Sequence, residues 1–183
     1  MLKTIMTLTA AISGVLTAAL AGVYHLYPLG WIESLAITAG TFFYHFAMRL
    51  AVGTAFIPFQ KHDPHSKWFA EKPFEATLYK RLKVRKWKDR MPTYDQASFD
   101  TQNRTLEEIV TAMCHSELVH ETIAVLSFLP LFAAIPFGAF PVFLLTSIAA
   151  AAFDLSFVIM QRYNRPRILR LIQRKAKNKG LHS

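Results

Sequence analysis

The chain has 183 residues, a formal net charge of +9 and a hydrophobic fraction of 52%. This combination of charge and hydrophobicity excludes an ordinary soluble domain. The sequence separates the two properties: long apolar blocks with almost no charge alternate with two basic blocks. Such a pattern is typical of a polytopic membrane protein with cationic surfaces beside the membrane.

Four apolar blocks are long enough to cross a bilayer as helices. The first follows Lys3 and has features of a signal peptide, but it is longer than the apolar part of one, so we interpret it as a span. We expect an all-α integral membrane protein with a single membrane domain over residues 1–183. The expected spans lie at about 4–28, 31–57, 118–135 and 141–161, with a loop at 58–117 and a basic tail at 162–183.

The loop contains a stretch, residues 67–90, in which basic side chains alternate with aromatic and aliphatic ones. This composition favours a basic amphipathic segment lying among the headgroups of an anionic leaflet. A basic patch is also compatible with nucleic-acid contact. The flanking spans argue against that alternative, so we expect membrane lipids and no nucleic acid as partners.

The third helix is expected to begin before the membrane. Thr105 and Glu108 have the spacing of a capping box, which predicts a helix from Thr105 to about Ile135 with a kink at Pro130. In the last block, Pro166 directly follows Arg165, and this pair predicts a turn or a new helix start.

The distribution of Lys and Arg predicts the orientation. Both basic blocks and Lys3 fall on one side of a four-span protein, whereas the turns at 29–30 and 136–140 contain no Lys or Arg. The positive-inside rule then places both termini and the large loop in the cytoplasm.

Ionisable side chains inside the apolar blocks are candidates for function. His45 and Arg49 are four residues apart and share a helix face, and Arg49 and Asp154 each lie about 12 Å from a predicted helix exit. An arginine at this depth can snorkel to the surface, but the neighbouring histidine favours a polar cavity. A carboxylate at the depth of Asp154 needs a partner.

The segment from Cys114 to Glu121 contains two acids and two imidazoles directly before an apolar run. Glu117 and His120 share one helix face, and they continue an apolar stripe formed by residues 106, 109, 110 and 113. We therefore expect both groups to point toward protein and to be functional, although a water-exposed helix start is the alternative. Cys114 is the only cysteine, which excludes an internal disulfide, and we interpret it as packing.

Three motifs resemble those of one family. They are VRKWKD at 84–89, ELVH at 117–120 and QRYNRPR at 161–167. They are similar to motifs of the glycosyl-4,4′-diaponeurosporenoate acyltransferases, which are bacterial membrane enzymes of carotenoid biosynthesis. The resemblance covers roughly residues 60–180. It implies transfer of a fatty acyl group to the sugar of a glycosylated carotenoid in the cytoplasmic membrane.

The resemblance and the buried polar groups define the expected site. We expect no cofactor beyond an acyl donor, either a fatty acyl thioester or a phospholipid, and a glycolipid or glycosylated carotenoid as acceptor. His120 and Glu117 are the expected catalytic residues. The expected substrate-binding residues are His45, Arg49, Trp87, Lys88, Asp154, Arg162, Asn164, Arg165 and Arg167.

Acyl transfer to a hydroxyl needs a base and groups that stabilise an oxyanion. His120 is the best base in the chain, Glu117 is expected to orient it, and Arg49 or Arg162 is expected to hold a phosphate or the oxyanion. The chain has neither a His-x4-Asp motif at His120 nor a Gly-x-Ser-x-Gly motif, which favours direct transfer.

Two other functions are compatible with parts of the sequence. A metal-dependent lipid hydrolase would use His115, Glu117, His120 and Glu121, but the two histidines are five residues apart and point about 140° away from each other, so we expect no metal. A non-enzymatic lipid-binding protein explains the basic surfaces. It does not explain polar groups buried in the spans.

Overall fold

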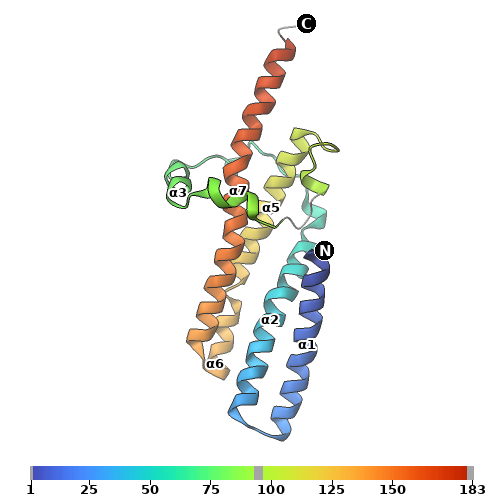
Figure 1. Ribbon diagram of the computed structural model, residues 1–183, viewed down its shortest axis with the longest axis vertical. Helices are drawn as coiled ribbons and strands as arrows, with labels where there is room; N and C mark the ends of the chain where they lie inside the picture. Colours follow the sequence, from blue (N-terminus) through green and yellow to red (C-terminus); the bar gives the residue numbers. More distant parts are fainter. Residues whose placement is uncertain (1, 93–96, 181–183) are drawn as a thin grey trace. The chain divides into compact units, whose positions relative to one another are not determined.

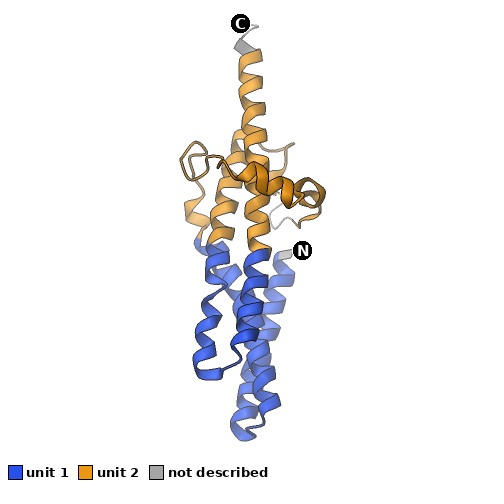
Figure 2. Cartoon of the chain, turned by 90° about the vertical axis from the view of Figure 1, so that its left-hand side faces the viewer, with its two compact units in different colours: residues 1–55, 122–152 blue, residues 56–121, 153–183 orange. Residues whose placement is uncertain are grey.

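The computed structural model describes residues 2–92 and 97–180, and within them it contains helices and no β-strand (Figure 1). The chain divides into two compact units, residues 1–55 with 122–152 and residues 56–121 with 153–183 (Figure 2). Two long helices, α5 (Leu106–Leu126) and α7 (Phe140–Gly180), contribute to both units. The single membrane domain expected from the sequence stays a prediction.

The all-α class with four spans is confirmed. Four helical segments are long and apolar enough to cross a membrane, judged by length and composition. These segments are Lys3–Leu26, Gly30–Ala55, Leu106–Phe137 and Phe140–Asn178.

In the first unit, α1 (Leu2–Leu26) packs along α2 (Gly30–Ala55). The contact is close at Gly14, where an added Cβ atom would lie 3.0 Å from a ring carbon of Phe43. Small residues at such positions let membrane helices approach each other. Large apolar side chains remain exposed along α1, as lipid contact requires, among them Leu8, Ile12 and Val15.

Polar residues of α2 make contacts within the same unit. Arg49 donates hydrogen bonds to the carbonyl oxygens of His45, at 2.8 Å, and Ala150, at 3.4 Å. The buried ring of His45 packs edge-on against Tyr44, whose hydroxyl donates to the carbonyl oxygen of Leu126 at 2.7 Å. Tyr44 thereby ties α2 to the end of α5, and Arg49 ties it to α7.

The third span is not one continuous α-helix. The expected capping box is confirmed: the Thr105 amide donates to the Glu108 carboxylate at 2.8 Å, and the Glu108 amide donates to the Thr105 hydroxyl at 3.2 Å. The expected continuation to Ile135 is wrong, because α5 ends at Leu126 and is followed by 3-10 helix η4 (Leu129–Ala133) and α6 (Ala134–Phe137). Pro130 has no backbone N–H to donate, so it suits the start of η4 better than a helix interior.

The loop of the second unit is built from short helices. They are η1 (Ile57–Phe59), α3 (Glu75–Arg81), α4 (Val84–Trp87), η2 (Lys88–Arg90) and η3 (Ala97–Phe99). Lys83 has a positive φ of 51° between α3 and α4, which ends one helix before the other begins. The polar loop expected at 93–103 lies partly outside the described residues.

The turn or new helix start expected at Pro166 is wrong. α7 continues through Pro166 to Gly180, although a proline inside a helix typically costs about 3 kcal/mol. The neighbouring side chains explain the continuation. Leu169, Ile172 and Gln173, which follow the proline, line cavities together with residues 64–65 and the start of α5, so the helix beyond Pro166 remains beside other parts of the second unit.

Candidate functional site

A histidine and an aspartate meet in the second unit, between α5 and α7. The Nδ1 atom of His120 lies 2.9 Å from Oδ1 of Asp154. The side chain of Asp154 is 2% exposed, whereas that of His120 is 19% exposed. The imidazole stacks on Phe157 with ring centres 4.5 Å apart and planes 7° apart. The carboxylate and the phenyl ring together fix the position and the plane of the imidazole.

This geometry determines which nitrogen can act as a base. A buried carboxylate accepts a hydrogen bond, so we assign the proton of the neutral ring to Nδ1. Nε2 then carries the lone pair and can accept a proton. The aspartate stabilises the imidazolium that forms, which is the role of the acid in a catalytic triad. We call His120 and Asp154 the His–Asp pair.

Glu117, one turn before His120 on α5, has a different environment. It is fully buried, and its two carboxylate oxygens contact two arginines of α7. Nη1 of Arg162 donates to Oε1 at 2.5 Å, and Nη1 of Arg165 donates to Oε2. Arg165 is itself 1% exposed, so both charges are removed from water and neutralise each other.

The same two arginines hold the segment 68–75. Arg162 donates to the carboxylate of Glu75, with an Nη2–Oε1 distance of 2.6 Å, and to the carbonyl oxygens of Trp68 and Ala70. Arg165 donates to the carbonyl oxygen of Phe69 at 2.7 Å and lies over its ring. We call Glu75, Glu117, Arg162 and Arg165 the arginine cluster.

Glu75 is buried and has a further partner. It accepts a hydrogen bond of 2.8 Å from the hydroxyl of Tyr79. Burial raises the pKa of Tyr79, and the hydrogen bond to Glu75 raises it further. Tyr79 therefore stays a neutral donor, and its ring packs edge-on against Tyr163 of α7. This contact extends the attachment of the loop to α7 beyond the arginine cluster.

His120 and Glu117, which were expected to act together, have separate partners in the structure. It pairs His120 with Asp154 and not with Glu117, because both oxygens of Glu117 are occupied by arginines. Arg162 and Arg165, expected to bind substrate, direct their guanidinium groups at protein carboxylates and carbonyls. Their geometry is that of residues that position the 68–75 segment.

The other expected residues lie outside both groups. The indole of Trp87 donates to the carbonyl oxygen of Leu82 at 3.0 Å, and Lys88 pairs with Asp89 at 2.6 Å. Arg167 is exposed and lies over the ring of Tyr163, 3.5 Å from its centre. The remaining expected residues are Asn164, which is half-buried, and His45 and Arg49, which belong to the first unit.

Several residues of the site were not expected from the sequence. Besides Glu75, they are Trp68 and, in a role other than the metal ligand of the alternative function, Glu121: the indole of Trp68 donates to the Glu121 carboxylate at 3.1 Å. The signal for Glu75 was available, because it is one of few acids in a strongly basic stretch. Among the described residues, no three His, Cys, Asp or Glu side chains come together as a metal site would require.

Comparison with known proteins gives one match. A family model described as glycosyl-4,4′-diaponeurosporenoate acyltransferase matches residues 65–174, which is more than half of the chain. This range includes both the His–Asp pair and the arginine cluster. No curated protein and no solved structure matches the chain.

Proposed function

This chain belongs to the glycosyl-4,4′-diaponeurosporenoate acyltransferase family, and from that premise we propose that it esterifies a sugar hydroxyl of a glycosylated carotenoid or related isoprenoid with a fatty acyl group. The single observation that supports this chemistry best is the His–Asp pair. It combines a buried carboxylate with an imidazole that remains partly exposed.

His120 acts as the general base. Its Nε2 takes the proton from the acceptor hydroxyl as the oxygen attacks the carbonyl carbon of the acyl donor. Asp154 keeps the ring in the required tautomer and stabilises the positive charge on the imidazole. Phe157 keeps the ring plane fixed, so the lone pair is already aimed when substrate arrives.

The second half of the reaction returns the proton. The tetrahedral intermediate collapses, the bond from the carbonyl carbon to the leaving group breaks, and the leaving group takes the proton from Nε2 of His120. The products are the ester and the protonated leaving group, and His120 is neutral again. No covalent acyl-enzyme is needed, which agrees with the burial of Cys114, the only thiol in the chain.

The decisive experiment uses purified protein in lipid nanodiscs. Incubation with a glycosylated carotenoid and a fatty acyl donor is expected to give a product heavier by one acyl group, detected by mass spectrometry and cleaved by mild base. Thioester and phospholipid donors are supplied in separate reactions. If neither donor yields a sugar ester, the proposal is wrong.

We further propose that both termini and the 58–117 loop lie on the cytoplasmic side of the bacterial cell membrane. The support is the absence of Lys and Arg from the turns at 29–30 and 136–140. A reporter fused after Ser183 is expected to be active only in its cytoplasmic form, and one inserted at Gly138 only in its external form. A cytoplasmic signal at Gly138 contradicts this orientation.

A further inference from the structure

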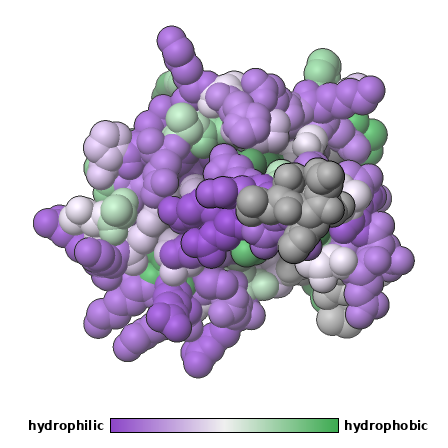
Figure 3. All heavy atoms as spheres, turned by 90° about the horizontal axis from the view of Figure 1, so that it is seen from above, coloured by the Kyte–Doolittle hydropathy of each residue, from purple (hydrophilic) through white to green (hydrophobic). Residues whose placement is uncertain are grey.

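The part of α7 beyond Pro166 carries a row of basic side chains on one face. Arg167, Arg170, Arg174 and Lys177 are spaced by three, four and three residues, so they fall within about 80° of the helix circumference. All four are exposed, and in the described part of the chain no carboxylate forms an ion pair with them. We call these four residues the basic stripe. The end of the molecule that bears the C-terminus is largely hydrophilic (Figure 3).

The proposed chemistry does not use this stripe. Counted along α7, Arg167 lies about 20 Å from Asp154 and Lys177 about 35 Å from it. Charges at that distance do not contact the reacting atoms. Like charges on one helix face also repel one another, so grouping the four charges does not itself stabilise the fold, although Arg167 lies over the ring of Tyr163. Its cations are therefore available to a binding partner.

The length of α7 indicates that this partner is not the membrane. About twenty residues cross the hydrocarbon, so a span that begins at Phe140 leaves it near Met160, and the headgroups add about 5–7 Å. Arg170 then lies about 15 Å and Lys177 about 25 Å beyond the hydrocarbon along the helix. Electrostatic attraction in physiological salt is screened over about 8 Å. Most of the stripe is therefore out of reach of anionic lipid and faces the aqueous phase.

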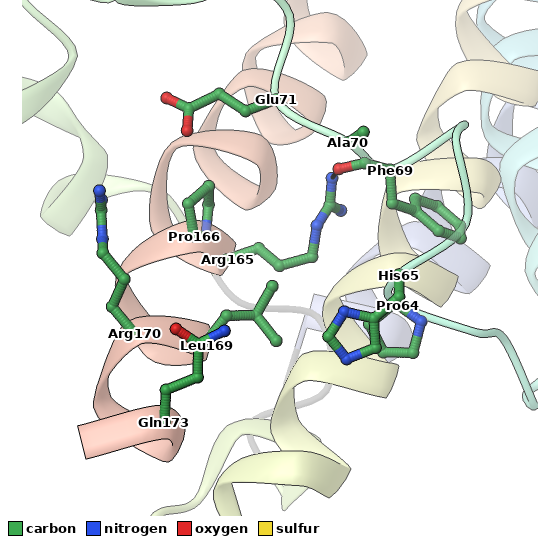
Figure 4. Close-up of a pocket in the computed structure, with 10 residues that line it drawn as sticks. All are labelled: Pro64, His65, Phe69, Ala70, Glu71, Arg165, Pro166, Leu169, Arg170 and Gln173. Atoms are coloured by element: carbon green, nitrogen blue, oxygen red, sulfur yellow. Dashed lines mark hydrogen bonds between the residues drawn. The ribbon is translucent and has the colours of Figure 1, made fainter. Parts of the chain in front are cut away.

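A cavity of about 280 Å³ borders the stripe at Arg170. Figure 4 shows it between residues 64–71 and α7, with the side chains of His65, Leu169 and Gln173 among those that line it. A second cavity of about the same volume shares these three residues and extends toward the start of α5. Each is smaller than a typical site for a whole ligand, and the lining mixes polar and apolar groups. The two cavities together suit a thin, partly polar chain better than a compact ligand.

We infer that the basic stripe docks a soluble acidic protein that carries the fatty acyl group as a thioester, and that the adjoining cavities receive the arm between carrier and thioester. This inference rests on the proposed acyl transfer and names its donor. A phospholipid donor would be held by cations at the bilayer, where residues 67–90 are expected, so it gives the stripe no role. A small free thioester does not need a row of cations about 15 Å long. A carrier protein with an acidic surface would contact the row of cations, and its arm would occupy the adjoining cavities.

With a carrier-bound thioester as the acyl donor, the bonds formed and broken in the reaction balance. The acceptor oxygen forms a bond to the thioester carbonyl carbon, the carbon–sulfur bond breaks, and the sulfur takes the proton from Nε2 of His120. The carrier leaves as a free thiol. No oxidant, reductant or further reactant is required.

The test measures binding and turnover separately. The full-length protein is placed in nanodiscs of phosphatidylcholine, and a bacterial acyl carrier protein loaded with a fatty acyl group is titrated against it. The stripe variant replaces Arg170, Arg174 and Lys177 by Glu, and a matched control replaces Lys80, Arg81 and Lys86 by Glu. All six side chains are exposed, so both variants make the same change in charge without disturbing buried contacts.

The stripe variant is expected to bind the carrier at least about tenfold more weakly, whereas the control variant keeps most of the affinity, and added salt weakens wild-type binding. In turnover, the stripe variant is expected to show a raised KM for the carrier-bound donor and an unchanged kcat. Its rate with the N-acetylcysteamine thioester of the same fatty acid is expected to equal that of the wild type.

Other outcomes overturn the inference. Equal carrier binding by the wild type and the stripe variant contradicts docking at the stripe. Loss of binding to phosphatidylglycerol vesicles, or to the free coenzyme A thioester, without loss of carrier binding assigns the stripe to those ligands instead. If the wild type binds the carrier through the stripe but forms no sugar ester from any donor, the proposed acyl transfer fails and the docking surface stands.

Discussion

Asp154 and Glu117 are two carboxylates with almost the same burial and different partners. Both are buried, and both lie where α5 and α7 face each other in the second unit. Asp154 pairs with an imidazole, a group that can act as an acid and a base, whereas Glu117 pairs with guanidinium groups, which cannot. Burial therefore does not identify the catalytic group. A carboxylate with a catalytic role is distinguished from one with a structural role by its partner, which must be able to exchange a proton and must be partly exposed.

The largest effect is expected for His120. His120→Ala should lower turnover by about 10² to 10⁴, the usual contribution of a general base, while the protein stays folded and inserted. His120→Gln should not restore activity, because an amide can donate a hydrogen bond to Asp154 but cannot accept a proton. Turnover per folded molecule is the measurement. His115→Ala is the control, since residue 115 contacts the carbonyl of Phe59 and the ring of His62 and not the pair. If His115→Ala abolishes activity and His120→Ala does not, the assignment of the base is wrong.

Asp154→Asn is expected to lower turnover by about 10²-fold, less than removal of the ring. The amide keeps the size of the carboxylate but cannot stabilise the imidazolium, and it permits the wrong tautomer of His120. The loss should appear in kcat, because the ring and its stacking on Phe157 remain. Wild-type kcat in this variant would remove Asp154 from the mechanism.

Glu117→Gln tests the other half of the comparison. The change leaves Arg162 and Arg165 without their shared carboxylate, and breaking a buried ion pair in this way costs about 3–5 kcal/mol of stability. We expect a large fall in thermal stability in detergent, with the activity of the remaining folded protein reduced much less than in His120→Ala. Glu121→Gln is the matched control, because Glu121 is not in the arginine cluster. Full stability with lost turnover in Glu117→Gln would assign Glu117 to catalysis instead.

The smallest effect is expected at Trp68. Trp68→Phe removes the indole donor to Glu121 and keeps most of the aromatic surface. The bond is exposed, so its loss should cost at most about 1 kcal/mol. Protease digestion of the 68–75 segment measures whether that segment stays attached. Release of the segment in Trp68→Phe, but not in Glu117→Gln, would show that the exposed contact and not the arginine cluster holds it.

The amino-acid sequence predicted the elements and the inward face well, for physical reasons. Uninterrupted apolar blocks determine spans almost by themselves, and the apolar stripe on α5 correctly placed Glu117 and His120 toward protein. A helical stripe shows which side of a helix is buried, but it does not show which side chain lies opposite. His120 and Asp154 are separated by 34 positions in the chain, so no local pattern indicates their contact and the nearer acid, Glu117, was the expected partner.

Local rules also failed where tertiary contacts opposed them. Pro166 was expected to mark a turn or a new helix start, but α7 continues through it, and Leu169 and Gln173 beyond it lie beside residues 64–65. Glu75 was overlooked because it lies in a basic stretch that suggested only a surface. Its partner Arg162 is 87 residues away, beyond the reach of any local pattern.

The order in which the chain is synthesised gives the arginine cluster a further consequence. The carboxylates of Glu75 and Glu117 leave the ribosome before either arginine, because both arginines are on the last long helix. Until α7 has been made and inserted, the two acids lack these partners and the 68–75 segment has no attachment to it. A chain truncated before Arg162 is therefore expected to expose this segment to proteases and quality-control enzymes. Biogenesis of the reactive centre is then complete only when the final helix has been inserted.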